Sequence, residues 1–171
     1  MEALKILLIQ TITVAPPVLI TAVGACLCEI PGVINMGLEG IMLSGAFSAA
    51  VVNYFTGNPY LGILSGVIVG ILMALIHAII SIHLKGDQII SGVAINLFAT
   101  ATTSYLIKTI FKVSGSTPAA ANHPNNALVI AFIYILAFVT YFVVYHTVFG
   151  LRIRAVGEHP LAADTVGISV Y

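Results

Sequence analysis

The sequence predicts an all-α integral membrane protein with about five transmembrane helices. Of its 171 residues, 60% are apolar and only 7% are charged, whereas soluble proteins are about one quarter charged. Five stretches are apolar over the roughly 20 residues that a helix needs to cross a bilayer. The net charge is zero, so the composition does not indicate a nucleic-acid partner. The expected environment is the lipid bilayer.

These five apolar stretches follow one another along the chain and are separated by polar turns. The first contains Pro16 and Pro17, and two adjacent prolines remove two backbone donors and should kink a helix. The longest loop covers residues 112–126. The expected helices cover about residues 4–28, 32–55, 60–84, 89–111 and 127–149.

Residues 29–40, between the first two apolar stretches, combine a proline, three glycines, an asparagine and two glutamates. Such a broken, polar segment at membrane depth is tolerated where it packs against protein or lines a wet cavity. We expect Pro31 to open the second helix, with Asn35 and Glu39 on one of its faces because they are four residues apart. Broken helices of this kind mark substrate sites in transporters. Asn35 and Glu39 are therefore candidate substrate-path residues, and the alternative for Glu39 is a structural carboxylate that accepts backbone hydrogen bonds.

The fourth expected helix carries a polar stripe, with a small or polar residue at every fourth position. Two interpretations are open: hydrogen bonding between helices, or lining of a transport pathway by Asn96 and Thr100. The stripe consists of Gly92, Asn96, Thr100 and Ser104.

Small residues also recur every fourth position on the third and second expected helices. Such ridges let another helix approach closely, and they serve packing in any polytopic membrane protein. The ridges are Gly62, Gly66, Gly70, Ala74 and Ala78, and Gly40, Ser44 and Ser48.

The region 150–167 is too polar to cross a membrane and should form two short helices joined by a bend. Gly157 is expected to break it, while Pro160 suits a first helical turn and Gly167 suits the residue beyond a helix end. One interpretation is an amphipathic segment that Arg152 and Arg154 hold against lipid headgroups.

No catalytic residues, metal ligands or cofactor-binding motif are identified. The sequence has no phosphate-binding loop of the Gly-x-x-x-x-Gly-Lys-Ser/Thr type and no His-Glu-x-x-His motif. The sequence also shows no nucleophile, general base and orienting residue at a spacing typical of a catalytic site. ATP-driven transport would therefore require a separate ATPase subunit.

Three separated stretches resemble the permease subunits of ABC importers for nucleosides and related simple sugars. Members of that family usually carry a basic residue after the first glutamate, where this chain has Ile30. The matching stretches are Glu29 with Gly32–Phe47, then Asp87–Leu97, and the Gly-x-Arg-x-Arg-Ala-x-Gly-Glu pattern that begins at Gly150.

The resemblance implies a fold like that of type II ABC importers, in the plasma (inner) membrane. It also implies three protein partners: a cytosolic ATP-binding cassette ATPase, a second permease subunit (in a homodimer or a heterodimer), and an extracellular substrate-binding lipoprotein. The 150–167 region would be the cytoplasmic segment that couples to the ATPase, which places the amino terminus outside. The residues implied in this coupling are Arg152, Arg154, Gly157, Glu158 and Pro160.

Members of the family are longer and continue with several more membrane spans. The chain is therefore expected to be an amino-terminal portion, a single transmembrane domain over residues 1–171. Two alternatives to an ATP-driven importer remain. One is an ion-coupled secondary transporter or channel that uses Glu39 and Asp87, and the other is an inactive permease fragment.

Overall fold

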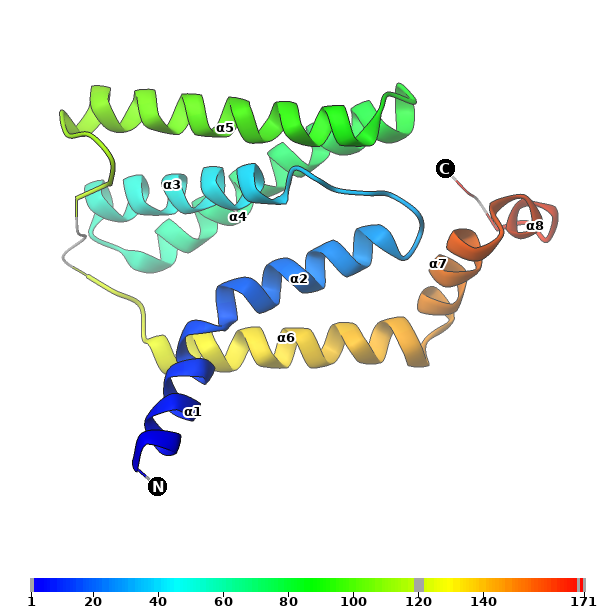
Figure 1. Cartoon of the computed structure of the whole chain (residues 1–171), viewed down its shortest axis with the longest axis horizontal. Helices are drawn as coiled ribbons and strands as arrows, with labels where there is room; N and C mark the ends of the chain where they lie inside the picture. The colour runs from blue at the N-terminus through cyan, green and yellow to red at the C-terminus, as the bar shows by residue number, and fades with distance from the viewer. Residues whose placement is uncertain (1, 119–121, 169, 171) are drawn as a thin grey trace. The chain divides into compact units, whose positions relative to one another are not determined.

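The computed structural model describes residues 2–118, 122–168 and 170, which form helices and connecting segments and include no strand. Four of these helices are long and apolar enough to cross a membrane, and a fifth span results if α1 and α2 are counted as one bent helix. The prediction of an all-α multi-pass membrane protein is confirmed. The elements (Figure 1) are α1 (Glu2–Val14), α2 (Pro16–Glu29), α3 (Leu38–Thr56), α4 (Pro59–Ala78), the π-helix η1 (Ile79–His83), α5 (Gln88–Phe111), α6 (Asn126–His146), α7 (Val148–Glu158) and α8 (Pro160–Thr165).

The first apolar stretch is bent where the two prolines predict it. Helices α1 and α2 meet at an angle of 51°, and Pro16 and Pro17 form the first turn of α2. Prolines in the first turn of α2 remove no hydrogen bond from α2 itself. Because proline has no backbone N–H, however, they cannot donate hydrogen bonds to the carbonyl groups at the end of α1.

The helices form two compact units, one made of Met1–Val33 with Asn125–Tyr171 and the other of Ile34–Pro124. We call them the outer-sequence unit and the central-sequence unit, after their places in the chain. Each is described by itself below.

In the central-sequence unit, α3 packs closely against α4 through glycines of the predicted ridge. A Cβ atom added to Gly62 would lie 2.7 Å from the carbonyl oxygen of Ala49, and one added to Gly66 would lie 2.9 Å from that of Gly45. Larger residues would push the helices apart, as expected for small-residue packing in membranes. Gly40, which was predicted to belong to the small-residue ridge of the second expected helix, faces α5.

A small apolar core joins the three long helices of this unit. Met73 of α4 and Ile95 and Ala99 of α5 are buried together, and Ile41 of α3 and Val69 of α4 pack against them. This core fixes α5 against the beginning of α3, which positions the site described below.

In the outer-sequence unit, α7 folds back against the turn after α2. A Cβ atom on Gly157 would overlap the carbonyl oxygen of Ile30, so glycine permits this close approach. The two short helices predicted for 150–167 are present as α7 and α8, and Pro160 begins α8. The expected break at Gly157 is wrong, because Gly157 lies inside α7 and the bend falls at His159.

Candidate functional site

The polar segment between α2 and α3 is irregular, as predicted, but the non-helical part is longer than expected. Helix α2 ends at Glu29 and α3 begins only at Leu38. Pro31 therefore lies in a turn and does not open a helix, and the expected helical face shared by Asn35 and Glu39 is wrong.

Local side-chain chemistry explains why the chain is not helical there. Gly32 has a φ of 95°, a left-handed conformation that suits glycine and interrupts a right-handed helix. Asn35 accepts a hydrogen bond through its Oδ1 from the backbone N–H of Gly37, two residues on, at 3.0 Å. Such a turn competes directly with the helical bonding pattern.

Two amide side chains of α5 hold the part of this segment that enters α3. Gln88 Oε1 accepts a hydrogen bond from the backbone N–H of Ile34 at 2.7 Å. Asn96 binds at two points: its Nδ2 donates to the Met36 carbonyl at 2.9 Å, and its Oδ1 accepts from the Gly40 N–H at 2.7 Å. Gln88 and Asn96 are eight residues apart and so lie on one face of the helix. We call this arrangement the α5 clamp.

Gly92 lies between the two amides of the clamp and lets the segment touch the backbone of α5. A Cβ atom at this position would lie 2.7 Å from both the Gly37 nitrogen and the Met36 Cβ. Gly40 is equally restricted, because its Cβ would lie 2.8 Å from the Asn96 Cα. Gly92 and Asn96, the first half of the polar stripe, are thus used to bind the irregular segment.

The predicted path residues lie around the beginning of α3. Glu39 is exposed in the first turn of α3, and no described residue forms an ion pair or hydrogen bond with its carboxylate. The backbone N–H donors that a structural role for this carboxylate would need are not found among the described residues. Asn35 and Asn96 are half-buried nearby. Thr100 lies one turn further along α5, exposed, with its hydroxyl donating to the Asn96 carbonyl at 2.8 Å.

This arrangement offers a carboxylate and amide groups at the end of a helix, which are groups that hydrogen-bond the hydroxyls and N–H groups of a polar solute. Among the described residues there is no cluster of three or more metal-ligating side chains.

Sequence reasoning missed Gln88 and the buried pair His77 and Ser91. His77 Nδ1 lies 3.0 Å from Ser91 Oγ, which joins α4 to α5 beside Gly92. Gln88 follows Asp87, whose carboxylate caps α5 by accepting from two backbone N–H groups at 2.9 Å. An aspartate at a helix start is a recognisable cap, but nothing in the sequence indicates what the glutamine after it binds.

The residues implied in coupling all lie on α7 and α8. Arg152 and Glu158 are exposed, and Arg154 is half-buried with its guanidinium 5.4 Å from the centre of the Tyr145 ring. This distance is within the range of a cation–π interaction. Pro160 starts α8 after the bend at His159.

Comparison with known proteins identifies a protein family and several relatives of this chain. Residues 7–171 match the family described as branched-chain amino acid transport system / permease component. The chain is 37% identical to the guanosine ABC transporter permease protein NupQ of Bacillus subtilis, over 99% of the chain and 61% of the relative. It is 33% identical to the nucleoside ABC transporter permease protein NupC of Lactococcus lactis, with the same coverage.

Another relative is named for a sugar. The putative glucose ABC transporter permease protein TsgC13 of Haloferax volcanii is 34% identical over 96% of the chain and 55% of its own length. The chain thus spans about three fifths of the length of these curated relatives. No solved structure matches it.

Proposed function

Because the chain belongs to the branched-chain amino acid transport system / permease component family, we propose that it is a membrane-spanning subunit of an ATP-driven importer. The proposed substrates are nucleosides or related simple sugars, and the proposed location is the plasma membrane. The observation that carries this proposal is the 37% identity to a guanosine permease over nearly the whole chain. The long apolar helices are consistent with it.

We place the substrate path at the start of α3. Glu39, exposed and without a described partner, would accept hydrogen bonds from substrate hydroxyls or N–H groups. Asn35 and Asn96 would position this end of α3, and Thr100 would extend the path along α5. The α5 clamp supports this role, because it fixes the irregular backbone from two points and so pre-organises the groups around it.

The protein partners follow from the family. The proposed partners are a cytosolic ATP-binding cassette ATPase, a second permease subunit and an external substrate-binding lipoprotein. Helices α7 and α8 would contact the ATPase, with Arg152, Arg154 and Glu158 offering charged groups on α7. Gly157 and Pro160 would set the shape of this segment, through the close contact with the Ile30 carbonyl and the start of α8.

Uptake measurements test the importer proposal. The chain is expressed with the ATPase and binding protein of its own host, and the uptake of labelled guanosine and ribose is followed. We expect uptake that requires a hydrolysis-competent ATPase. Uptake that persists without the ATPase and collapses with the ion gradient would favour a secondary transporter instead.

The role of Glu39 is tested by Glu39→Gln, with Glu2→Gln at the exposed start of α1 as the control. Losing a hydrogen bond to a charged group costs about 1.5–3 kcal/mol, so uptake should fall roughly 10- to 100-fold at low substrate. Folded yield is measured in parallel. A lower yield with unchanged uptake per folded molecule would contradict direct substrate contact.

A further inference from the structure

Three buried residues follow one face of the carboxyl end of α4 and continue into the π-helix η1. Met73, His77 and Ser81 are four residues apart, which places them on the same side of the helix. Their exposed fractions are 8%, 3% and 8%. Met73 belongs to the apolar core of the central-sequence unit, whereas the other two side chains are polar. Because His77 and Ser81 are buried, they depend on protein groups for their hydrogen bonds.

The hydrogen-bonding capacity of these two polar side chains is only partly used. His77 Nδ1 lies 3.0 Å from Ser91 Oγ. His77 Nε2 and Ser81 Oγ have almost no exposed surface and no hydrogen-bond partner in the part of the chain that the structure describes. The protonation state of the imidazole does not change this, because each ring nitrogen is either a donor or an acceptor in every state. The packed arrangement therefore carries the cost of two buried, unpaired polar groups.

The backbone that follows His77 departs from a regular α-helix. In η1 the Leu84 N–H donates to the Ile79 carbonyl, five residues back, at 3.0 Å. The Gly86 N–H then donates to the Ile80 carbonyl, six residues back, at 2.9 Å. Lys85 between them has a φ of 51°, which is uncommon for a residue other than glycine. Single π-helical turns occur frequently at functional sites, and this one has no regular helical bonding that opening would have to break.

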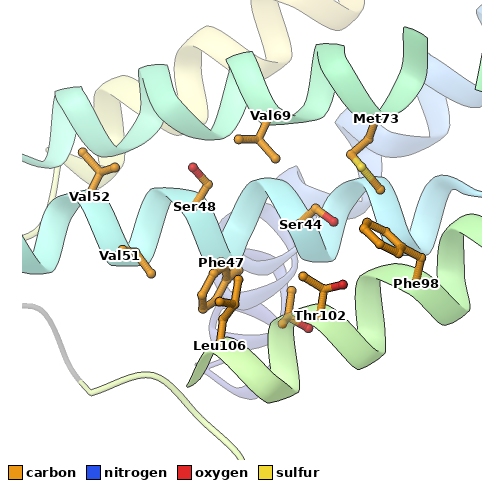
Figure 2. A pocket seen from close by; sticks show the side chains of 11 residues that line it. Ser44, Phe47, Ser48, Val51, Val52, Val69, Met73, Phe98, Thr102 and Leu106 are labelled. Atoms are coloured by element: carbon orange, nitrogen blue, oxygen red, sulfur yellow. The ribbon is translucent and has the colours of Figure 1, made fainter. Parts of the chain in front are cut away.

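The attachment of α5 to α4 is also limited. Helix α5 packs mainly against α3, and its contact with α4 is small. An open apolar groove of about 310 Å³ lies alongside α3, with Met73 of α4 and Phe98 and Leu106 of α5 among the residues that line it (Figure 2). The hydrogen bond between His77 and Ser91 joins α4 to α5. Separating the start of α5 from η1 therefore breaks few contacts.

We propose that His77, Ser81 and Ser91 form a latch between η1 and the start of α5, which opens while the rest of the central-sequence unit stays folded. We call it the η1 latch. In the open state, water reaches the imidazole of His77 and the hydroxyl of Ser81 and supplies their missing hydrogen bonds. Because η1 is the carboxyl end of the candidate span Pro59–His83, these groups open toward the membrane surface, where water is available.

The η1 latch connects this opening to the candidate substrate path. Ser91 lies on α5 between Gln88 and Asn96, the two amides of the α5 clamp. Opening therefore frees the part of α5 that holds the irregular segment before α3. This consequence rests on the proposed function, since an importer needs a path that changes conformation. The latch itself is tested without transport, so a lack of ATPase-dependent uptake would count against the proposed function alone.

Two serine-to-alanine substitutions test the latch by hydrogen exchange of the full chain in micelles, followed at the amides of η1 and Leu84. Ser81→Ala removes a hydroxyl that has no partner, so it should slow this exchange at least about fivefold. Ser91→Ala removes the partner of His77 and should speed it about fivefold. The two serines are matched controls for each other, because both are buried, at 8% and 5% exposed. Exchange in the core around Ala99 should not change in either variant.

Changes of the same sign in the two variants would overturn the proposal. Faster exchange around Ala99 in Ser91→Ala would also overturn it, because the loss would then be a general destabilisation and not a local opening.

Thiol labelling measures water access to the latch directly. In a chain carrying Cys26→Ala and Cys28→Ala, a water-soluble maleimide should label Ser81→Cys at least about tenfold faster than Met73→Cys, because only the first position opens locally. Met73 is the matched control, since it lies on the same face and has the same exposed fraction of 8%. Melting temperatures show that both variants are folded. Equal labelling rates at the two positions would overturn the proposal.

Discussion

The hydrogen bonds of Asn96 predict a specific loss of stability in Asn96→Ala. One bond caps α3 at Gly40, and losing a helix cap costs about 1 kcal/mol. The other bond joins two segments through the Met36 carbonyl, and hydrogen bonds between helices in membranes average about 0.6 kcal/mol. Met36 is exposed, whereas Gly40 is buried, so the Gly40 N–H loses its acceptor away from solvent and carries the added penalty of a buried unpaired group. The expected decrease in the free energy of unfolding is at least about 1.5 kcal/mol.

The measurement is reversible unfolding of the purified chain in mixed micelles, with the denaturing detergent as the variable. Thr100→Ala is the matched control, since Thr100 lies one turn further on the same helix and its hydroxyl binds only its own helix. Its free energy of unfolding should change by less than about 0.5 kcal/mol, as is usual for surface substitutions. If Asn96→Ala and Thr100→Ala have the same effect within that margin, the α5 clamp does not hold the segment.

The remaining predictions concern close contacts and one hydrogen bond. Gly92→Ala should destabilise the chain by about 1–3 kcal/mol because its methyl group would overlap the irregular segment, whereas Gly24→Ala, with no atom within 4 Å of its Cβ, should be neutral or stabilising in thermal unfolding. Gly157→Ala should also lower the melting temperature more than Gly24→Ala, since its methyl group would overlap the carbonyl that follows α2. Gln88→Ala should speed hydrogen exchange at the Ile34 amide about fivefold, the equivalent of one lost hydrogen bond. Gln88→Glu retains the acceptor oxygen and should exchange like the unsubstituted chain, and a faster exchange in both would contradict the bond.

The positions of the helices could be predicted because the bilayer imposes a length and an apolar composition on each span. The expected stretches 60–84, 89–111 and 127–149 agree to within about three residues at each end with α4 plus η1, α5 and α6. The kink at Pro16 was also predictable, since proline changes the backbone whatever its neighbours are.

The start of α3 could not be predicted from neighbouring residues. By local pattern alone, a helix from Gly32 with Asn35 and Glu39 on one face was reasonable. The structure has an irregular segment with turns there instead, because Gln88 and Asn96 offer hydrogen bonds to it from 54 to 60 residues later in the sequence. The bend at His159 was missed for a similar reason: Gly157 permits a distant contact and does not interrupt its own helix.

The α5 clamp also constrains the order in which the protein can assemble during synthesis. The donors and acceptor of the irregular segment leave the ribosome more than fifty residues ahead of the amides that bind them, which at about 5–20 residues per second corresponds to roughly 3–12 seconds. During that interval α5 is not yet available to pack against the hairpin of α3 and α4. Water or the insertion machinery must therefore supply the hydrogen bonds that the irregular segment later makes with Gln88 and Asn96. Nascent chains that stop before residue 96 should therefore leave this segment open to proteases or to labelling reagents, and slightly longer chains should protect it.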